Sequence, residues 1–225
     1  MHTQGTDVKS KKVAQGLATR AALLSAARRL FGEHGYVGTA TDDIVTAAGV
    51  TKGALYHHFG GKRQLFEVVF EQAKREASEQ AANAFLEPDP WLDLLAGCRA
   101  TLDAHLDPAV LRITLLDGRA VLSWDTVRRV ESRYGAVILR GALRRAVNSG
   151  VLQPLPLRTM AEMLNGAIVE GCILIAEAPD RASAHQEVTH SIEQLLGGLR
   201  QPPRERHTPT RLPDTSQSVP ATRPK

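Results

Sequence analysis

The chain has 225 residues, 43% of them hydrophobic, which is enough for one or two domains with a sizeable core. Its net charge of +4 is unevenly spread. Residues 1–62 hold eight Lys/Arg and four Asp/Glu, and residues 200–225 hold six and two, so each end carries +4 and residues 63–199 carry −4. Basic ends around an acidic middle suit a protein whose end meets a polyanion, although basic tails are also often only solubilising.

The two cysteines, Cys98 and Cys172, have no metal-ligand spacing, and a disulfide cannot be inferred from so distant a pair. We expect both to be buried free thiols in a reducing compartment. The N-terminus lacks an apolar signal core, and no apolar run approaches the roughly 18 residues that span a bilayer. The sequence therefore predicts a cytoplasmic protein with no membrane partner.

Residues 1–14 are polar and basic, and we expect them to be a disordered arm. Such an arm either has no role, or follows a DNA backbone or enters a minor groove. Leu23, Leu24, Ala27, Leu30 and Phe31 then recur at helical spacing and predict a helix over residues 17–34, which Gly35 ends.

Residues 39–62 read as a helix-turn-helix. Thr39 is expected to cap its first helix with Asp42 three residues later, and Gly49 is placed at the turn because glycine enters the left-handed region without steric cost. Thr51 is expected to cap the second helix, in which Leu55 and Phe59 share one face. The short or basic residues that open this helix allow a close approach to a nucleic-acid backbone.

The remaining patterns predict helices over residues 62–85, 90–106, 108–116, 123–148, 157–176 and 181–199. Asp117-Gly118-Arg119 is expected to end the segment that begins at 108. No alternating strand pattern appears, so the fold class is all-α with about nine helices. We expect a helix-turn-helix domain over 15–62, a second helical domain over 63–200 and a disordered tail over 201–225.

The N-terminal part of the chain resembles the tetracycline-repressor (TetR/AcrR) family of transcriptional regulators. The matching positions are Leu24, Ala27, Leu30, Phe31, Gly35, Tyr36, Thr39, Asp43-Ile44, Ala48-Gly49-Val50, Gly53, Leu55-Tyr56, His58-Phe59, Lys62 and Leu65-Phe66. Val45 is a mild departure, since the family usually has alanine there. Residues 63–200 resemble the family only in helix count and arrangement, and Asp117-Gly118 and Trp124 look like a subgroup with unassigned ligands.

The resemblance implies that the domain over 15–62 binds DNA and that the domain over 63–200 binds a ligand and forms the dimer. It implies a homodimer whose recognition helices enter successive major grooves of a palindromic, double-stranded DNA operator. Residues 157–176 and 181–199 would pair with their symmetry mates in a four-helix bundle. A small molecule, not identified by the sequence, would bind within residues 63–200 and release the DNA. No cofactor is implied.

Ten residues are candidates for DNA contact: Thr39, Thr41, Thr51, Lys52, Gly53, Ala54, Tyr56, His57, His58 and Lys62. Lys52 can reach a phosphate or a guanine edge, and Ala54 can touch a thymine methyl. Tyr56 and Lys62 resemble family residues that contact phosphate, although the Tyr56 ring can equally close the small core. His57 and His58 point about 100° apart on a helix, which disfavours a shared metal, so no metal site is expected.

Six polar or aromatic residues are candidates for an effector pocket, although each could instead be a surface charge or a core-capping aromatic. They are Arg99, His105, Arg112, Trp124, Tyr134 and Glu170.

Two other classes of function compete with a ligand-responsive repressor. The sequence has no nucleophile elbow, phosphate loop, HExxH or paired-carboxylate motif, so an enzyme is not expected. A DNA-binding regulator that answers to a protein partner, or to no effector, stays open.

Overall fold

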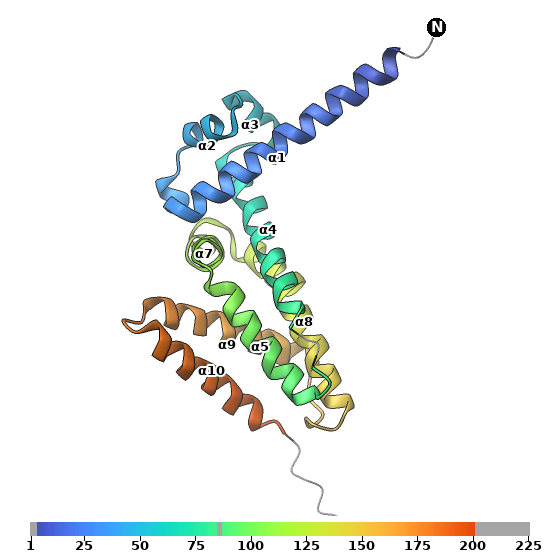
Figure 1. Ribbon diagram of the computed structural model, residues 1–225, viewed down its shortest axis with the longest axis vertical. Helices are drawn as coiled ribbons and strands as arrows, with labels where there is room; N and C mark the ends of the chain where they lie inside the picture. The colour runs from blue at the N-terminus through green and yellow to red at the C-terminus, as the bar shows by residue number, and fades with distance from the viewer. Residues whose placement is uncertain (1–3, 85–86, 201–225) are drawn as a thin grey trace, which may run out of the picture.

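The computed structural model describes residues 4–84 and 87–200, which are almost entirely helical (Figure 1). The helices are α1 (Gln4–Gly38), α2 (Thr41–Ala48), α3 (Lys52–Phe59), α4 (Lys62–Ala82), α5 (Pro90–Leu106), α6 (Pro108–Leu111), the π-helix η1 (Arg112–Asp117), α7 (Gly118–Val121), α8 (Trp124–Asn148), α9 (Leu157–Glu177) and α10 (Arg181–Gly197). Because α6, η1 and α7 follow without a break, the described residues form nine continuous helical segments. The predicted all-α class is confirmed.

Helix α1 begins much earlier than expected. The prediction of a disordered arm over residues 1–14 is wrong from Gln4 onward, and residues 1–3 lie outside the described residues. Residues 4–34 contain no proline, and their lysines, glutamines and alanines are good helix formers that can extend an already nucleated helix into solvent. At Gly35 the backbone leaves the helical region with φ 73°, which is the predicted break.

Helices α1 to α4 share one core, which holds an aromatic cluster. The ring of Phe66 on α4 lies 5.1 Å from those of both Phe31 and Tyr36, in edge-to-face geometry. This core does not end at Lys62. It also takes in apolar side chains from η1, the α7–α8 turn and α8, namely Ile113, Leu122, Val127 and Val130.

A second core fills the other half of the molecule, between α5, α8, α9 and α10. Helix α4 runs from the first helices into this half (Figure 1). Two exposed ion pairs join α4 to α8, Glu67 to Arg129 and Glu71 to Arg133, each at 3.0 Å. Exposed pairs contribute little each, so the packing of the two helices holds α4 in place.

The segment from α6 to α7 differs from its prediction at one end. Asp107 caps α6 as expected, accepting from the amides of Ala109 (3.1 Å) and Val110 (2.9 Å). The expected stop at Asp117-Gly118-Arg119 is wrong, because Gly118 is helical (φ −55°) and the helix continues to Val121. Gly118 has a packing role instead: a Cβ built on it would lie 2.5 Å from Cε2 of Phe70.

Helix α9 is long and apolar enough, by length and composition, to cross a bilayer, with a mean hydropathy of 1.4 over 18 residues. The expectation that no such segment exists was therefore too strict. A core helix passes the same test, and α9 buries Ala161, Leu164, Ile168, Cys172 and Ile175 at helical spacing in the second core.

Candidate nucleic-acid interface

The turn between α2 and α3 has the geometry that the sequence predicts. Gly49 adopts the left-handed conformation (φ 65°, ψ 32°), and the amide of Val50 donates to the carbonyl of Val45 over 3.0 Å. That hydrogen bond satisfies a carbonyl at the end of α2, as in a Schellman cap. The chain therefore turns within two residues and starts α3 directly.

Helix α3 divides into a buried and an exposed face. Thr51 caps it as predicted, because its Oγ1 accepts from the amide of Ala54 over 3.3 Å. Leu55 and Phe59 are buried in the first core. The solvent-facing residues are Lys52, Gly53, Tyr56 and His57, while Ala54 and His58 are half-buried. The exposed set is polar, basic or small, as a helix that approaches DNA requires.

Thr39 is not part of the exposed surface of α3, and the prediction that it caps α2 is wrong. It is 1% exposed, and its hydroxyl lies 2.8 Å from the Gly35 carbonyl and 3.1 Å from that of Leu30. The kink at Gly35 folds the chain back, so Thr39 satisfies carbonyls at the end of α1. The cap lies one residue later: Ala40 precedes α2, and Asp43 accepts from its amide over 3.0 Å.

Lys52 has a partner that the sequence did not reveal. Its ammonium lies 2.9 Å from Oδ1 of Asp42 on α2, with both side chains exposed. The hydrogen bond with Asp42 raises the pKa of Lys52. The pair crosses the turn between the two helices and holds the positive charge at the start of α3.

The other predicted contacts surround α3. Thr41 is half-buried at the start of α2, and Tyr56 is 53% exposed. Lys62 opens α4 with its ammonium 4.2 Å from the centroid of the Tyr36 ring, and partial burial lowers its pKa. Sequence reasoning missed Arg20 on α1, whose guanidinium lies 5.1 Å from the centroid of the Phe59 ring. No sequence pattern marks Arg20, because its partner lies on another helix.

Two family models match the chain. Residues 23–69 match the family described as "Bacterial regulatory proteins, tetR family", and residues 91–199 match "Tetracyclin repressor-like, C-terminal domain". The HTH-type transcriptional repressor AcnR of Corynebacterium glutamicum is 33% identical over 145 residues, covering 60% of this chain and 73% of AcnR. The chain belongs to the TetR family of transcriptional regulators.

Other relatives agree with this TetR-family membership. The "Probable acrEF/envCD operon repressor" of Escherichia coli K12 is 41% identical over 83 residues, which are 36% of this chain but only 38% of that protein. A TetR-family transcriptional regulator from Pectobacterium atrosepticum is 34% identical, covers 85% of this chain and 98% of its own, and superposes with a TM-score of 0.73.

Two more distant structures share the TetR fold alone. RolR, solved with resorcinol, is 18% identical with a TM-score of 0.66, covering 81% of this chain and 89% of its own. AibR, solved with isovaleryl coenzyme A and operator DNA, is 21% identical with a TM-score of 0.57, covering 79% and 97%.

In the C-terminal part of this TetR-family chain, the six pocket candidates do not come together. Arg99 pairs with Glu193 on α10 at 3.0 Å, and Tyr134 donates to Glu71 on α4 over 3.0 Å. Arg112, Trp124 and Glu170 are exposed on η1, α8 and α9. Of the six, His105 alone is fully buried.

His105 belongs to a buried polar cluster that joins three helices. Its Nε2 lies 3.4 Å from the ammonium of Lys74 on α4, and its Nδ1 lies 2.8 Å from the Thr101 carbonyl. Lys74 is 3% exposed and lies 3.5 Å from Oε1 of Glu131 on α8. Burial lowers the pKa of Lys74, and the nearby carboxylate of Glu131 partly opposes this shift. Burial together with the Lys74 charge lowers the pKa of His105 to about 3. No sequence signal singles out Lys74, because it stands among charged surface residues of α4.

Proposed function

We propose that this protein is a homodimeric transcriptional repressor that binds a palindromic operator through α3 and is released by a small molecule. The observation that carries the proposal is the division of α3. Leu55 and Phe59 fix the helix to its core, while Lys52, Gly53 and Tyr56 stay exposed at the end of the molecule away from α9 and α10 (Figure 1).

The proposed contacts follow from side-chain chemistry. Lys52 reaches a phosphate or a guanine edge, and Gly53 allows close approach of the backbone. Tyr56 and Lys62 contact phosphates on either side of the groove. To bind, Lys52 exchanges Asp42 for a DNA group, so Asp42 opposes binding both as a competitor for the lysine and as a negative charge near phosphate.

The dimer is proposed to form through α9 and α10. These helices lie together at one edge of the molecule (Figure 1), and three large apolar side chains on them, Met163, Leu174 and Leu195, are more than half exposed. Between the two helices runs a groove of about 370 Å³ lined by residues that include Ala167, Leu174 and Val188. Exposed apolar helix surface of this kind is stabilised by a second copy, which a two-fold axis supplies.

Release is proposed as a population shift. One state holds the two α3 helices about one DNA turn apart, roughly 34–36 Å. A ligand that binds better to a state with another spacing disfavours DNA binding in proportion to that preference. RolR with resorcinol and AibR with isovaleryl coenzyme A support a ligand in this fold. Helix α4 transmits the conformational change from the ligand to α3, since it holds both Lys62 beside α3 and Lys74 in the buried polar cluster.

The DNA part is tested by selecting bound duplexes from a random library and titrating salt against the best one. Several phosphate contacts per subunit require the logarithm of the affinity to fall steeply and linearly with the logarithm of the salt concentration. A flat response contradicts the proposal. Native mass spectrometry of protein purified from its source distinguishes a small-molecule effector, which co-purifies, from control by a protein partner.

The interface is tested separately with Leu195→Glu, compared with Gln194→Glu at the neighbouring exposed position. We expect the first variant to sediment as a monomer and the second as a dimer. A dimeric Leu195→Glu variant contradicts an interface through α10.

A further inference from the structure

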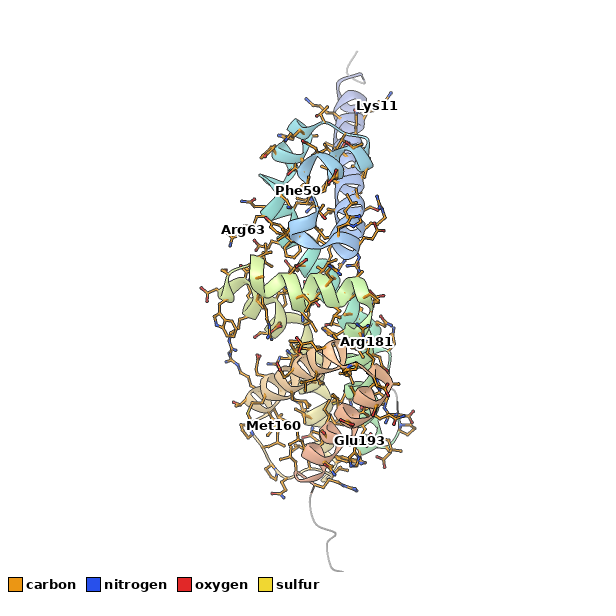
Figure 2. The ribbon with its side chains drawn as sticks, turned by 90° about the vertical axis from the view of Figure 1, so that its left-hand side faces the viewer. Lys11, Phe59, Arg63, Met160, Arg181 and Glu193 are labelled. Carbon is orange, nitrogen blue, oxygen red and sulfur yellow. The ribbon has the colours of Figure 1, made fainter. Side chains whose placement is uncertain are left out.

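Helix α1 extends well beyond the core that it helps to build. It starts at Gln4, but among the side chains whose burial the structure describes, the first buried one is Leu23. At a rise of 1.5 Å per residue, the stretch between them spans about 28 Å. In Figure 1 this part of α1 projects past α2 and α3, and Figure 2 shows Lys11 near the tip of the molecule, at the end opposite Glu193 of α10.

The extension has a fixed register against α3. A Cβ built on Gly16 would lie 3.9 Å from Cε1 of His58, and Arg20 lies over the ring of Phe59. Gly16 and Arg20 are one turn apart and therefore form the side of α1 that faces α3. Lys12 is one further turn toward the N-terminus on the same side. It therefore continues the surface of α3 past the end of that helix.

Apart from Asp7 near its start, the extension carries only positive charges. Between Lys9 and Glu33 the chain carries no acidic residue. The arginines nearer the core are paired, Arg28 with Glu76 at 2.8 Å and Arg29 with Glu33 at 3.0 Å. Lys11 and Lys12 are exposed, and no ion pair joins them to the side chains that the structure describes. Their charge is thus available to a polyanion that lies against the same end of the molecule as α3.

We propose that the α1 extension lies along the DNA backbone beside the operator half-site, where Lys11 and Lys12 bind phosphates that α3 does not reach. The inference rests on the proposed function, since it takes α3 as the element in the groove. The contacts are to phosphate, so they lengthen the footprint and raise affinity without reading sequence. In a dimer the two extensions flank the two half-sites, and each supplies both lysines.

The test compares Lys11→Gln/Lys12→Gln with the control Arg144→Gln/Arg158→Gln, which removes the same charge from exposed positions late in α8 and early in α9. Glutamine keeps the helix propensity of lysine. The probe is a duplex of about 40 base pairs with a selected operator at its centre and random sequence on both sides, so that it extends past two half-sites one helical turn apart. Each phosphate contact adds about 0.9 to the slope of log affinity against log salt.

We expect the Lys11/Lys12 variant to lower that slope by about two to four and to shorten the hydroxyl-radical footprint at both ends. The control should leave both unchanged. Equal slopes for variant and control overturn the inference. This outcome can be distinguished from failure of the proposed function. If Lys52→Ala weakens binding and Lys11→Gln/Lys12→Gln does not, the proposed role of α3 stands and only that of the α1 extension is contradicted.

A second arm addresses Val13 and Leu17, which are 58% and 65% exposed on the extension. If the extension instead pairs with another copy of the chain, Val13→Asp/Leu17→Asp lowers the oligomeric state in sedimentation. That result, together with an unchanged slope for the lysine variant, would overturn the DNA contact. An unchanged oligomeric state with a reduced slope supports it.

Discussion

The carboxylate of Asp117 accepts a 2.7 Å hydrogen bond from the backbone amide of Tyr36, from a distant part of the sequence. Asp117 ends the π-helix η1, and Tyr36 directly follows the kink of α1 at Gly35. The bond therefore joins the helix that leads into α2 and α3 to the segment between α6 and α7. π-Helical segments are rare and are often found at functional sites.

Asp117→Ala removes this acceptor and leaves a part-buried amide unsatisfied. We expect the free energy of unfolding to fall by about 1.5–3 kcal/mol, since the bond has a charged partner. Asp117→Asn keeps an acceptor oxygen and should lose less. Urea denaturation at fixed protein concentration measures both, with Glu177→Gln at the exposed end of α9 as the control. Equal stability of Asp117→Ala and wild type would show that the bond does not contribute.

Gly118 tests the packing of α7 on α4. A methyl group at this position would lie 2.5 Å from Cε2 and 2.8 Å from Cδ2 of Phe70, whose ring is fully buried. We expect Gly118→Ala to destabilise the protein by about 1–3 kcal/mol, because the ring has to move within a close-packed core.

The matched substitution is Gly141→Ala on α8, where the nearest atom to a new Cβ is Nη1 of Arg145 at 3.8 Å. It should stabilise the helix by about 0.5–1 kcal/mol. Urea denaturation compares the two variants, and a neutral Gly118→Ala would contradict the close approach of α7 to Phe70.

The pair between Lys52 and Asp42 predicts opposite effects on DNA binding. Lys52→Ala should weaken operator affinity by about tenfold or more and lower the salt slope by about one per subunit. Asp42→Asn frees the lysine and removes a negative charge, so affinity should rise several-fold. Fluorescence anisotropy across a salt series measures both. Weaker binding by Asp42→Asn would show that the carboxylate positions Lys52 for DNA instead of competing for it.

His105 gives the stability a pH dependence. Its pKa is about 3 in the folded protein, because of burial and the Lys74 charge, against about 6.5 in the unfolded chain. Between these values the unfolded state binds more protons, so stability is greatest above pH 6.5 and falls as the pH drops toward 3. The slope attributable to this group is about 1.4 kcal/mol per pH unit at most.

Urea denaturation between pH 7 and pH 4.5 checks this slope. We expect His105→Gln to flatten it and His190→Gln, on the exposed side of α10, to leave it unchanged. Equal slopes for wild type and His105→Gln would assign the acid sensitivity to other groups.

Local signals predicted most of the fold. Asp89, Asp107, Ser123 and Asp180 each accept from the amides that open a helix, as side chains do at such positions. Glycines at 49, 60 and 61 end or begin helices with positive φ. The wrong predictions concern residues whose conformation is determined by tertiary contacts and not by the local sequence. Gly118 reads as a stop signal but continues a helix beneath Phe70, and Thr39 reads as a cap but folds back onto α1.

The candidate site divides in the same way. The α3 surface follows from a short motif, because periodicity alone separates Leu55 and Phe59 from the residues between them. The effector candidates depended on residue type without spatial information. Five of the six lie at or near the surface of four helical segments, α5, η1, α8 and α9. The Lys74–Glu131 contact needs two helices from distant parts of the sequence to meet. No pattern within one helix encodes such a meeting.

The first core has a consequence for engineering. The apolar interior around α1 to α4 is completed by Ile113, Leu122, Val127 and Val130, so residues 1–62, which we propose to contact DNA, are not a self-contained domain. In a chimaera that joins residues 1–62 to the C-terminal part of a relative, the relative's side chains would replace these four residues. They would then pack poorly against Phe31 and Phe66. Successful exchange of operator specificity would therefore need the donor's counterparts of these four side chains, or transplantation of only the exposed residues of α3.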